Sequence, residues 1–511
     1  MKGKNEGGPA ATHAFARRGR AALLLLAAAA LAFVYLRGVP ENPPGFFVDE
    51  ASIAYNAQAL ARTGADEHGK RWPLYFRAFG EYKSPVYVYL LACVFKLAGP
   101  SITAARLLSA LAGFAAAALL GLVAWRATRH RAAGFIVAVS ASLTPWLFEI
   151  SRLVFEVALM PLALAVFLLV LRESSEKEDW TWGRAAALGA SLGLVSYTYS
   201  GGRLLAPLYA AGLLLFVTRS RMRGVLRAWA AYAATLLPLL LFAARHPGAL
   251  GERFKYVTFV TPQSTYAEIV LQFFKNYAGS FSPWAWLVEG DPEPRHHVAG
   301  MGSLLAATFV LAFAGLVVVL LRHRRDGWWR FVLYGLAVSP LPAALTLDRF
   351  HTLRLVALPV FLLLLNAPAL ARLNARDTNG TPRRRTSATL RRASLVLLVA
   401  LTLWQGAAFL RRFERAAPER LHNFDAFYPE VFDAALRLPQ RPIHVVDAPG
   451  APGYVLAYWY ATLRGVPTTQ FLRLENGATP PPGALVISTE TPCADCQLVL
   501  HRGPFRAYVK K

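Results

Sequence analysis

The sequence predicts an all-α polytopic membrane protein with about 11 transmembrane helices, large external loops and a small C-terminal external α/β domain. Of its 511 residues, 55% are hydrophobic and only 17% are charged. Apolar runs recur from near residue 20 to about residue 410, and polar, strand-like segments follow. A chain this long and this apolar does not fold around one soluble core. We therefore place the apolar runs in a membrane.

The charge distribution predicts the orientation of these helices. The net charge is +25, but Lys and Arg cluster in short loops at 126–131, 219–227, 322–330 and 372–392. Basic loops of this kind remain on the cytoplasmic side, so the charge indicates topology and not a nucleic-acid partner. The N-terminus is then cytoplasmic, and 40–102, 245–300 and the C-terminal region face outward from the cytoplasmic (inner) membrane.

The apolar runs divide the chain into a cytoplasmic tail at 1–19, a transmembrane domain at 20–410 and an external domain at 411–511. The first run resembles a signal peptide in length, but we expect a retained helix because the rest of the chain is itself membrane-embedded. Residues 85–98 are too few for a crossing that needs about 20 residues, so we predict a re-entrant or interfacial helix there. The predicted spans are 20–38, 103–125, 132–149, 157–172, 184–200, 203–218, 225–244, 301–321, 331–347, 353–371 and 393–410.

The C-terminal region has the pattern of a small α/β fold. Short β-type runs at 443–446, 484–487 and 497–500 flank a helical stretch at 454–463. Cys493 and Cys496 form a Cys-x-x-Cys pair on the side predicted to be oxidising. This pattern favours a local disulfide over a redox or metal site, because no second cysteine or histidine pair lies at ligand spacing.

Two adjacent acids, Asp49 and Glu50, follow the first apolar run and carry the main catalytic hypothesis. Aspartate is a preferred helix N-cap, so Asp49 could simply begin a helix that ends at Gly64. The alternative is that Asp49 is a general base, with Glu50 tuning its pKa or pairing with a cation. Neighbouring helical residues do not share a face, so only one of the two can point at a substrate.

A second acidic site brackets Ser151 and Arg152. Glu149 and Glu156 lie seven residues apart after the third span, where the predicted topology brings the chain to the external face. An ion pair with Arg152 would explain these acids equally well as a catalytic role.

Basic residues recur on the same external face. Snorkelling at helix ends explains any one of them, but the set next to carboxylates suits a phosphate carried on a lipid. The predicted phosphate- or donor-binding residues are Lys83, Arg203, Arg295, His296 and Arg354, with Arg349 and His351 nearby. Glu81 with His296 or His297 is a candidate ligand set for a divalent metal; no other cofactor is predicted.

These motifs resemble the membrane glycosyltransferases of the GT-C fold, in particular the bacterial aminoarabinose transferases of lipid A and the protein O-mannosyltransferases. The resemblance covers roughly residues 20–370. It is carried by Asp49-Glu50, Glu81 to Pro85, Ala104-Ala105-Arg106-Leu107, Ser151-Arg152 with a following acid, Tyr197-Thr198-Tyr199 with Arg203, and Asp291-Pro292 with Arg295-His296.

The resemblance implies transfer of a sugar from a polyprenyl-phosphate donor to a lipid, glycan or protein acceptor, with inversion at the anomeric carbon. It also implies that Asp49 is the base, Glu156 the second acid and Lys83 part of the phosphate-binding element. Two residues depart from the family pattern: Ser84 replaces the first proline after that lysine, and Glu156 is one methylene longer than the usual aspartate.

Two other functions remain open from the sequence. A polytopic transporter or flippase for a lipid-linked or anionic substrate would also carry acids and arginines in a membrane domain. It predicts charges near the midplane and an internal repeat, whereas the charges here gather at one face. A scaffold that presents the external domain is the third interpretation. Neither the sugar nor the acceptor is readable from the sequence.

Overall fold

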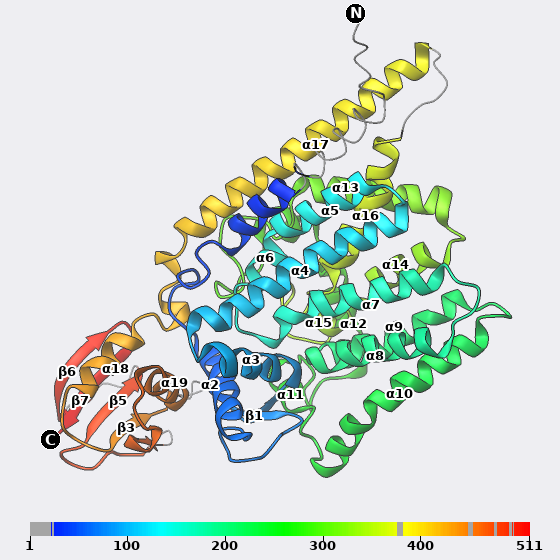
Figure 1. Cartoon of the computed structure of the whole chain (residues 1–511). Helices are drawn as coiled ribbons and strands as arrows, with labels where there is room; N and C mark the ends of the chain where they lie inside the picture. Colours follow the sequence, from blue (N-terminus) through cyan, green and yellow to red (C-terminus); the bar gives the residue numbers. More distant parts are fainter. Residues whose placement is uncertain are drawn as a thin grey trace, which may run out of the picture.

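A long helix and a small sheet domain frame a bundle of shorter helices in the computed structural model of this protein (Figure 1). The structure describes residues 22, 25–375, 382–447, 453–474, 478–489, 493 and 495–511. The predicted cytoplasmic tail at 1–19 lies outside the described residues. The first described helix is Leu25–Leu36.

The N-terminal half contains the segment that follows this helix, which was predicted to be external, and the first part of the bundle. Its β1 and β2 form an antiparallel hairpin. The elements are α2 (Val48–Thr63), β1 (Phe76–Ala78), β2 (Glu81–Lys83), α3 (Pro85–Ala98), α4 (Ile102–Thr128), α5 (Arg131–Leu143), α6 (Pro145–Ile150), η1 (Glu156–Leu159), α7 (Met160–Ser175), α8 (Trp182–Thr198), α9 (Gly202–Gly212), η2 (Leu213–Phe216) and α10 (Met222–Arg245).

The second half of the bundle is more interrupted. Its elements are α11 (Glu252–Val257), α12 (Tyr266–Gly279), the π-helical turn η3 (Ala285–Glu289), α13 (Ala306–Val318) continued by the π-helical η4 (Val319–His323), α14 (Gly327–Val338), α15 (Leu341–Ala344), α16 (Leu358–Leu373) and α17 (Pro382–Arg415).

The centre of the bundle is apolar on every side. From Leu358 to Leu370 every residue of α16 is buried, and the helix packs against α4, α5 and α13. A helix that is hydrophobic all round is stable only when other helices surround it. The cavity described below lies outside this core, where the segments predicted to be external meet.

The structure confirms a predominantly helical membrane protein but not the predicted count of eleven crossings. Within the described residues, five helices are long and apolar enough to cross a membrane: Ile102–Thr128, Glu156–Ser175, Met222–Arg245, Ala306–His323 and Ala388–Arg415. Several predicted spans are broken. The run 132–149 divides at Thr144, whose extended backbone precedes Pro145, because proline disfavours a helical conformation in the residue before it.

The C-terminal region is a mixed α/β domain, as its pattern indicated. Its sheet has the order β4-β3-β5-β7-β6, with parallel β3–β4 and β3–β5 pairs and antiparallel β5–β7 and β6–β7 pairs. Cys493 and Cys496 are joined by a disulfide. The elements are η5 (Pro418–Arg420), η6 (His422–Phe424), α18 (Tyr428–Leu436), β3 (Ile443–Val446), α19 (Tyr454–Arg464), η7 (Thr468–Gln470), β4 (Phe471–Leu474), β5 (Leu485–Thr489), β6 (Cys496–Arg502) and β7 (Phe505–Lys510).

This domain adjoins the segment that carries the predicted base. Figure 1 shows the orange and red C-terminal elements beside α2, at the far end of α17. Helix α19 packs against α2, and the ring of Trp459 stacks on Phe46 with centroids 5.4 Å apart. The start of α2 is therefore held between the helical bundle and the C-terminal domain.

Candidate active site

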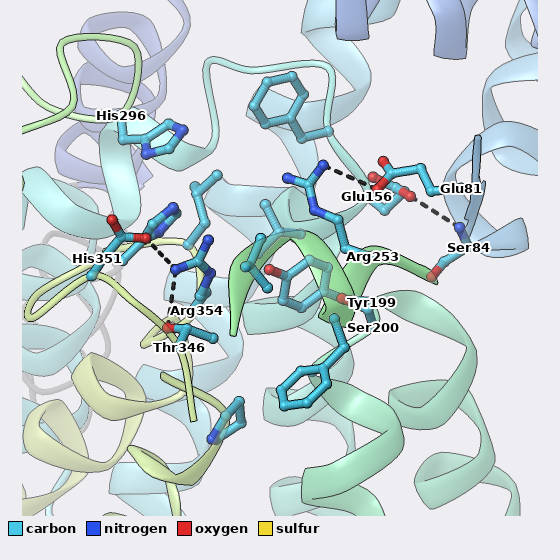
Figure 2. Close-up of a pocket in the computed structure, with 18 of the residues that line it drawn as sticks. Glu81, Ser84, Glu156, Tyr199, Ser200, Arg253, His296, Thr346, His351 and Arg354 are labelled. Atoms are coloured by element: carbon cyan, nitrogen blue, oxygen red, sulfur yellow. Dashed lines mark hydrogen bonds and ion pairs between the residues drawn. The ribbon is translucent and has the colours of Figure 1, made fainter. Parts of the chain in front are cut away.

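A cavity of about 930 Å³ opens where the segments predicted to be external meet (Figure 2). Its walls come from the start of α2, the β2–α3 turn, η1, the α8–α9 turn, α11 and the loops around residues 291 and 350. Its charged lining consists of Asp49, Glu81, Lys83, Glu156, Arg203, Arg253, Asp291, Glu293, Arg295, Asp348 and Arg354, with His296 and His351. Because acids and cations are nearly balanced, a bound anion competes with carboxylates for most of these cations.

Helix α2 separates the two acids predicted at its start. Val48 is its first residue and Gly64, at φ +70°, ends it as predicted. Asp49 lines the cavity and its side chain is 26% exposed, whereas Glu50 is fully buried. The helix-cap interpretation of Asp49 is wrong, because it is Glu50 Oε2 that accepts the N–H of the N-cap residue Phe47, at 3.0 Å.

Asp49 belongs to a network of two acids and two cations. Lys83 Nζ lies 2.7 Å from Asp49 Oδ1 and 2.8 Å from Glu81 Oε1, and Arg253 donates to Glu81 Oε2 at 3.0 Å. Burial raises the pKa of the Asp49 carboxyl. The charge and hydrogen bond of Lys83, together with the more distant charges of Arg253 and Arg295, lower this pKa by more than burial raises it, so the net pKa lies below its usual value. Asp49 is thus a carboxylate held by a shared lysine.

Glu156 meets this network from η1. Its Oε1 accepts the backbone N–H of Ser84 at 2.9 Å, and Figure 2 shows the two residues facing one another beside Glu81. Proline has no N–H, so a proline at position 84 could not make this bond. The two departures from the family pattern are therefore linked. The longer Glu156 side chain accepts the backbone N–H of residue 84, which is present because that residue is serine and not proline.

Glu50 was predicted to be one of the catalytic residues, but its surroundings show that it is a structural residue. Its carboxylate pairs with Arg106 Nη2 at 2.9 Å and accepts the N–H of Val154 at 3.1 Å. Arg106 also donates to the carbonyls of Pro40, Pro43 and Gly45. Both side chains are fully buried and no part of Glu50 lines the cavity.

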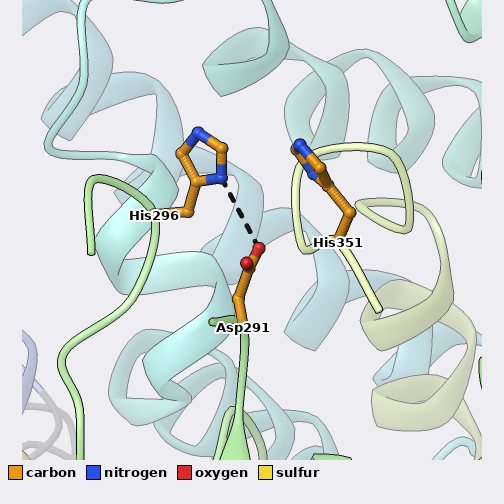
Figure 3. Close-up of side chains that lie close together, drawn as sticks. All are labelled: Asp291, His296 and His351. Carbon is orange, nitrogen blue, oxygen red and sulfur yellow. Dashed lines mark ion pairs between the residues drawn. The ribbon is translucent and has the colours of Figure 1, made fainter. Parts of the chain in front are cut away.

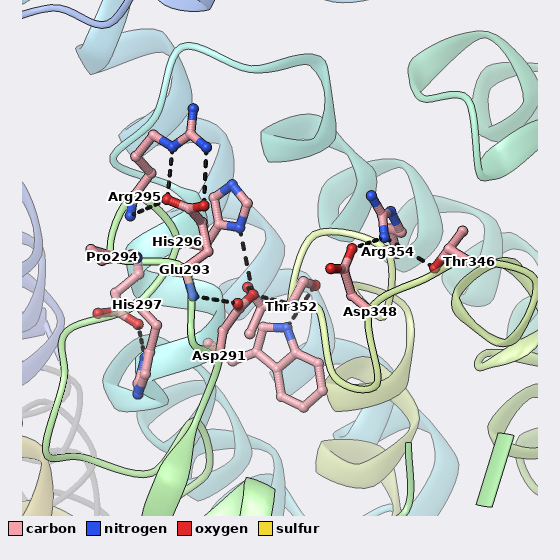
Figure 4. A network of polar contacts seen from close by, with 12 residues as sticks. Asp291, Glu293, Pro294, Arg295, His296, His297, Thr346, Asp348, Thr352 and Arg354 are labelled. Atoms are coloured by element: carbon pink, nitrogen blue, oxygen red, sulfur yellow. Dashed lines mark hydrogen bonds and ion pairs between the residues drawn. The ribbon is translucent and has the colours of Figure 1, made fainter. Parts of the chain in front are cut away.

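The predicted phosphate-binding cations all line the cavity. Arg295 is held by Glu293 through Nε and Nη2, at 2.8 and 3.0 Å. Arg354 pairs with Asp348 and donates to Thr346 Oγ1 (Figure 4). Arg203, at the start of α9, differs from these: among the described residues its buried Nη1 has no hydrogen-bond partner. Arg203 is therefore the arginine with donor capacity to spare.

A second polar group lies across the cavity from Glu156, around Asp291, His296 and His351 (Figure 3). One donor atom from each residue lies within 4.8 Å of the others. Asp291 Oδ2 accepts the N–H and the hydroxyl of Thr352, both at 2.7 Å, and faces His296 Nδ1 at 3.5 Å. The Nδ1 atoms of both histidines are buried without a hydrogen-bond partner in the described residues.

The protonation of this second group suits a metal. Burial raises the pKa of Asp291, but the neighbouring His296 and His351 bring it well below its usual range. Burial and the charge of Arg354 lower the pKa of His351 to about 3. A carboxylate and a neutral imidazole are the forms that bind divalent ions. These three residues fit a divalent cation.

The predicted pair of Glu81 and His297 is not brought together. His297 Nδ1 faces Glu149 Oε2 at 2.6 Å, and Nε2 donates to the carbonyl of Met301 at 2.6 Å. Burial lowers the pKa of His297, but the charge and hydrogen bond of Glu149 raise it above its usual value. A doubly protonated ring has no lone pair for a metal. Glu149 pairs with His297 rather than with Arg152, and neither lines the cavity.

Sequence reasoning missed Arg253 and Asp348. Arg253 lies on α11, a six-residue helix between α10 and α12, and it reaches Glu81 across 172 residues of sequence. Asp348 pairs with Arg354 within the loop between α15 and α16. Neither position stands out from the other charges near it. In the loop that contains Asp348, the three-residue spacing of His351 and Arg354 was the sequence pattern that could have indicated a site.

Comparison with known proteins gives one family match and two structural matches. Residues 82–246 match the family model for dolichyl-phosphate-mannose-protein mannosyltransferase. Two crystal structures of ArnT from Cupriavidus metallidurans superpose on almost the whole chain. The apo form has a TM-score of 0.59 and the form bound to undecaprenyl phosphate a TM-score of 0.57, each at 14% identity over 96% of this chain and 98% of that chain. The chain has the GT-C fold.

This finding confirms the fold that the sequence motifs implied. The GT-C match extends over the C-terminal domain, which the motif resemblance did not cover. The family match includes Lys83, Glu156 and Arg203 but begins after Asp49 and ends before the loop of Asp291. No protein among the curated ones matches the chain.

Proposed function

We propose that this protein is a membrane glycosyltransferase that moves a sugar from a polyprenyl-phosphate donor to a lipid, glycan or protein acceptor. The observation that carries the proposal is the meeting of Asp49, Lys83, Glu156 and four arginines in one cavity of a GT-C fold. The ArnT structure that this fold resembles was determined with undecaprenyl phosphate, which supports a polyprenyl-phosphate donor.

The cavity offers what such a transfer needs. The acceptor oxygen forms a bond to the anomeric carbon of the sugar while the bond from that carbon to the phosphate oxygen breaks, and polyprenyl phosphate leaves. Asp49 takes the acceptor proton, and Arg203, Arg295 and Arg354 stabilise the charge left on the phosphate. Attack from the face opposite the phosphate inverts the anomeric centre.

Lys83 couples donor binding to the basicity of Asp49. In this structure Lys83 holds the Asp49 carboxylate and lowers its pKa, which makes Asp49 a weak base. A donor phosphate that draws Lys83 away removes this effect and leaves burial, which raises the pKa. Asp49 then becomes a stronger base when the donor is bound. Glu156, held by Ser84, faces the same space and orients the acceptor.

Asp291, His296 and His351 are the residues that would hold a divalent ion in this cavity. Such an ion would add positive charge beside the phosphate. The transfer step described above is assigned to protein side chains and needs no chemistry of the ion.

The test of this function is transfer by the purified protein in liposomes that contain radiolabelled polyprenyl-phosphate sugar. We expect turnover with wild-type protein and a large loss of turnover, with residual activity, in Lys83→Met. The exposed Lys96→Met is the matched control, because Lys96 lies at the end of α3 and not in the cavity. Normal turnover in Lys83→Met would contradict the assignment of this cavity as the site of sugar transfer. Movement of the intact donor across the bilayer without transfer would instead identify a flippase.

We further propose that the cavity faces outward from the cytoplasmic membrane, with the N-terminus inside and the C-terminal domain outside. The native free cysteine, Cys93, is exposed and is replaced by serine for this test. In whole cells, an impermeant thiol reagent should label His68→Cys and not Arg219→Cys. The opposite labelling would reverse the topology.

A further inference from the structure

The segment 418–428, which joins α17 to α18, lies directly against the start of α2. Asp425 Oδ2 accepts the N–H of Val48 at 3.0 Å, although the two residues are 377 apart in sequence. Val48 is the residue before Asp49 and the first of α2. A C-terminal carboxylate therefore binds the backbone beside the proposed catalytic base.

This contact completes the start of the helix. The first N–H groups of a helix have no partner within it, and the side chain of the N-cap residue Phe47 cannot accept one. Glu50 accepts the N–H of Phe47 and Asp425 accepts that of Val48. A carboxylate at this end also complements the helix dipole. The position at which α2 begins, and hence the placement of Asp49, depends on an acid from the C-terminal region.

The approach of the two segments is close enough to constrain both backbones. A Cβ atom at Gly45 would lie 2.3 Å from the carbonyl oxygen of Phe424 and 2.5 Å from Cα of Ala426. Gly45 also has φ +70°, which favours glycine. Asp425 itself has φ +51°, a left-handed conformation that aspartate tolerates better than most residues. The contact is therefore built into the backbone on each side.

A second side chain of the same segment holds another wall of the cavity. Arg420 is 4% exposed and donates to the carbonyls of Pro294 and Arg295, at 2.9 and 3.2 Å. The guanidinium of Arg295 in turn lies over the ring of Phe47, 4.6 Å from its centroid. Three segments therefore contact one another pairwise: segment 418–428, the Arg295 loop and the start of α2.

We propose that segment 418–428 sets the spacing between Asp49 and Arg295 in the cavity, with Asp425 and Arg420 as positioning residues. The C-terminal domain is then part of the catalytic unit rather than an appended module. This inference rests on the proposed function. A misplacement of about 1 Å can cost roughly 100-fold in rate, so positioning of this kind is visible in kinetics.

The charge state of Asp425 offers a readout that a purely structural contact would lack. Burial raises the pKa of Asp425 to about 7; the charges of Glu50 and Asp49 act in the same direction, and the Val48 hydrogen bond and Arg295 oppose them. The buried phenols of Tyr428 and Tyr460 also face it. The raised pKa means that the packed state disfavours the ionised carboxylate more than the opened, solvated state does, so ionisation of Asp425 favours opening. Protection of the first turn of α2 should therefore fall as the pH rises toward about 7.

The test compares two variants of Asp425 in the full-length protein. Asp425→Asn keeps an oxygen acceptor, whereas Asp425→Gly removes the side chain and suits the left-handed backbone. Glu430→Gln is the matched control, an exposed acid on α18 of the same domain. Hydrogen exchange of peptides covering 45–51 and 290–298 is measured with kcat and KM for sugar transfer.

We expect Asp425→Gly to lose protection from hydrogen exchange at 45–51 and to lower kcat at least about tenfold. Asp425→Asn should remain near wild type in both measurements but should lack the pH-dependent change in protection. Arg420→Gln should deprotect 290–298 in the same way. Wild-type exchange in Asp425→Gly, or equal losses in both Asp425 variants, would overturn the positioning role. Hydrogen exchange needs no turnover, so a wild-type protein that transfers no sugar would refute the proposed function while the contact is still tested.

Discussion

Two ion-pair clusters start from neighbouring residues of α2 and have opposite surroundings. In the cavity cluster, Lys83 is shared between Asp49 and Glu81, and the Asp49 side chain is 26% exposed. In the buried clamp, Glu50 and Arg106 are both fully enclosed, and their remaining hydrogen bonds go to backbone groups. A buried ion pair with every partner supplied by the protein holds the architecture. A shared pair at a cavity wall can exchange a partner for a ligand.

The largest expected effect separates the two acids by activity. Asp49→Asn keeps the shape of the side chain but removes the base, so we expect sugar transfer to fall by about 10²–10⁴-fold. Expression and thermal unfolding should remain close to wild type, because Asp49 is not part of the buried clamp. The assignment fails if radiolabelled donor is still turned over at a near-normal rate.

Glu50→Ala should give the reverse result. It leaves the guanidinium of Arg106 buried without its carboxylate, and breaking a buried pair in this way costs about 3–5 kcal/mol. We expect a lower unfolding temperature, measured on protein in detergent, and reduced yield. Activity per folded molecule should fall less than in Asp49→Asn. A stable Glu50→Ala protein without activity would place Glu50 back among the catalytic residues.

Ser84 tests the contact on which Glu156 depends. Ser84→Pro suits the backbone, since residue 84 has φ −70°, but it removes the N–H that Glu156 accepts. Loss of a hydrogen bond to a charged acceptor is worth about 1.5–3 kcal/mol, and we expect kcat/KM to fall accordingly. Ser84→Ala keeps the N–H and serves as the control. Equal activity in the two variants would show that the contact does not position Glu156.

The pH dependence of kcat/KM tests the coupling of Lys83 to Asp49. The lowered pKa keeps Asp49 ionised into the acid range, so the acid limb of the wild-type profile should lie below the usual range of a carboxyl group. Lys83→Met removes the main lowering charge and leaves burial, which raises the pKa. The acid limb of the residual activity should therefore move to higher pH. An unchanged limb would mean that Asp49 is not the group that titrates.

The smallest effect is expected for an exposed pair on α11. Glu252 and Lys255 are 2.9 Å apart and lie outside the cavity lining. Surface pairs of this kind contribute about 0–1 kcal/mol, so Glu252→Gln should change both stability and turnover little. A large loss of turnover would show that α11 acts through more than Arg253.

Much of the fold could be predicted because its signals are local. Residues 85–98 form the helix that their length and apolarity indicated, and α2 ends at Gly64 as expected. Strand β3 occupies 443–446, and α19 begins at the predicted residue. The breaks at Thr144 and after Val338 were missed, because hydropathy averages over a run and does not register a local interruption. Strand β4 was missed because it is a four-residue segment without a clear alternating pattern, whereas β7 was missed although its apolar residues at 505, 507 and 509 alternate.

The sequence by itself determined the membrane character, the GT-C resemblance and the set of charged residues near one face, because hydropathy and short motifs are properties of neighbouring residues. Only the tertiary structure decided which acid faces the cavity. Asp49 and Glu50 are alike in the sequence; Arg106, 56 residues further along, takes Glu50 into the interior. The same holds for His296 and His297, which Asp291 and Glu149 draw to different places. Such choices depend on partners distant in the chain, and a local pattern does not contain them.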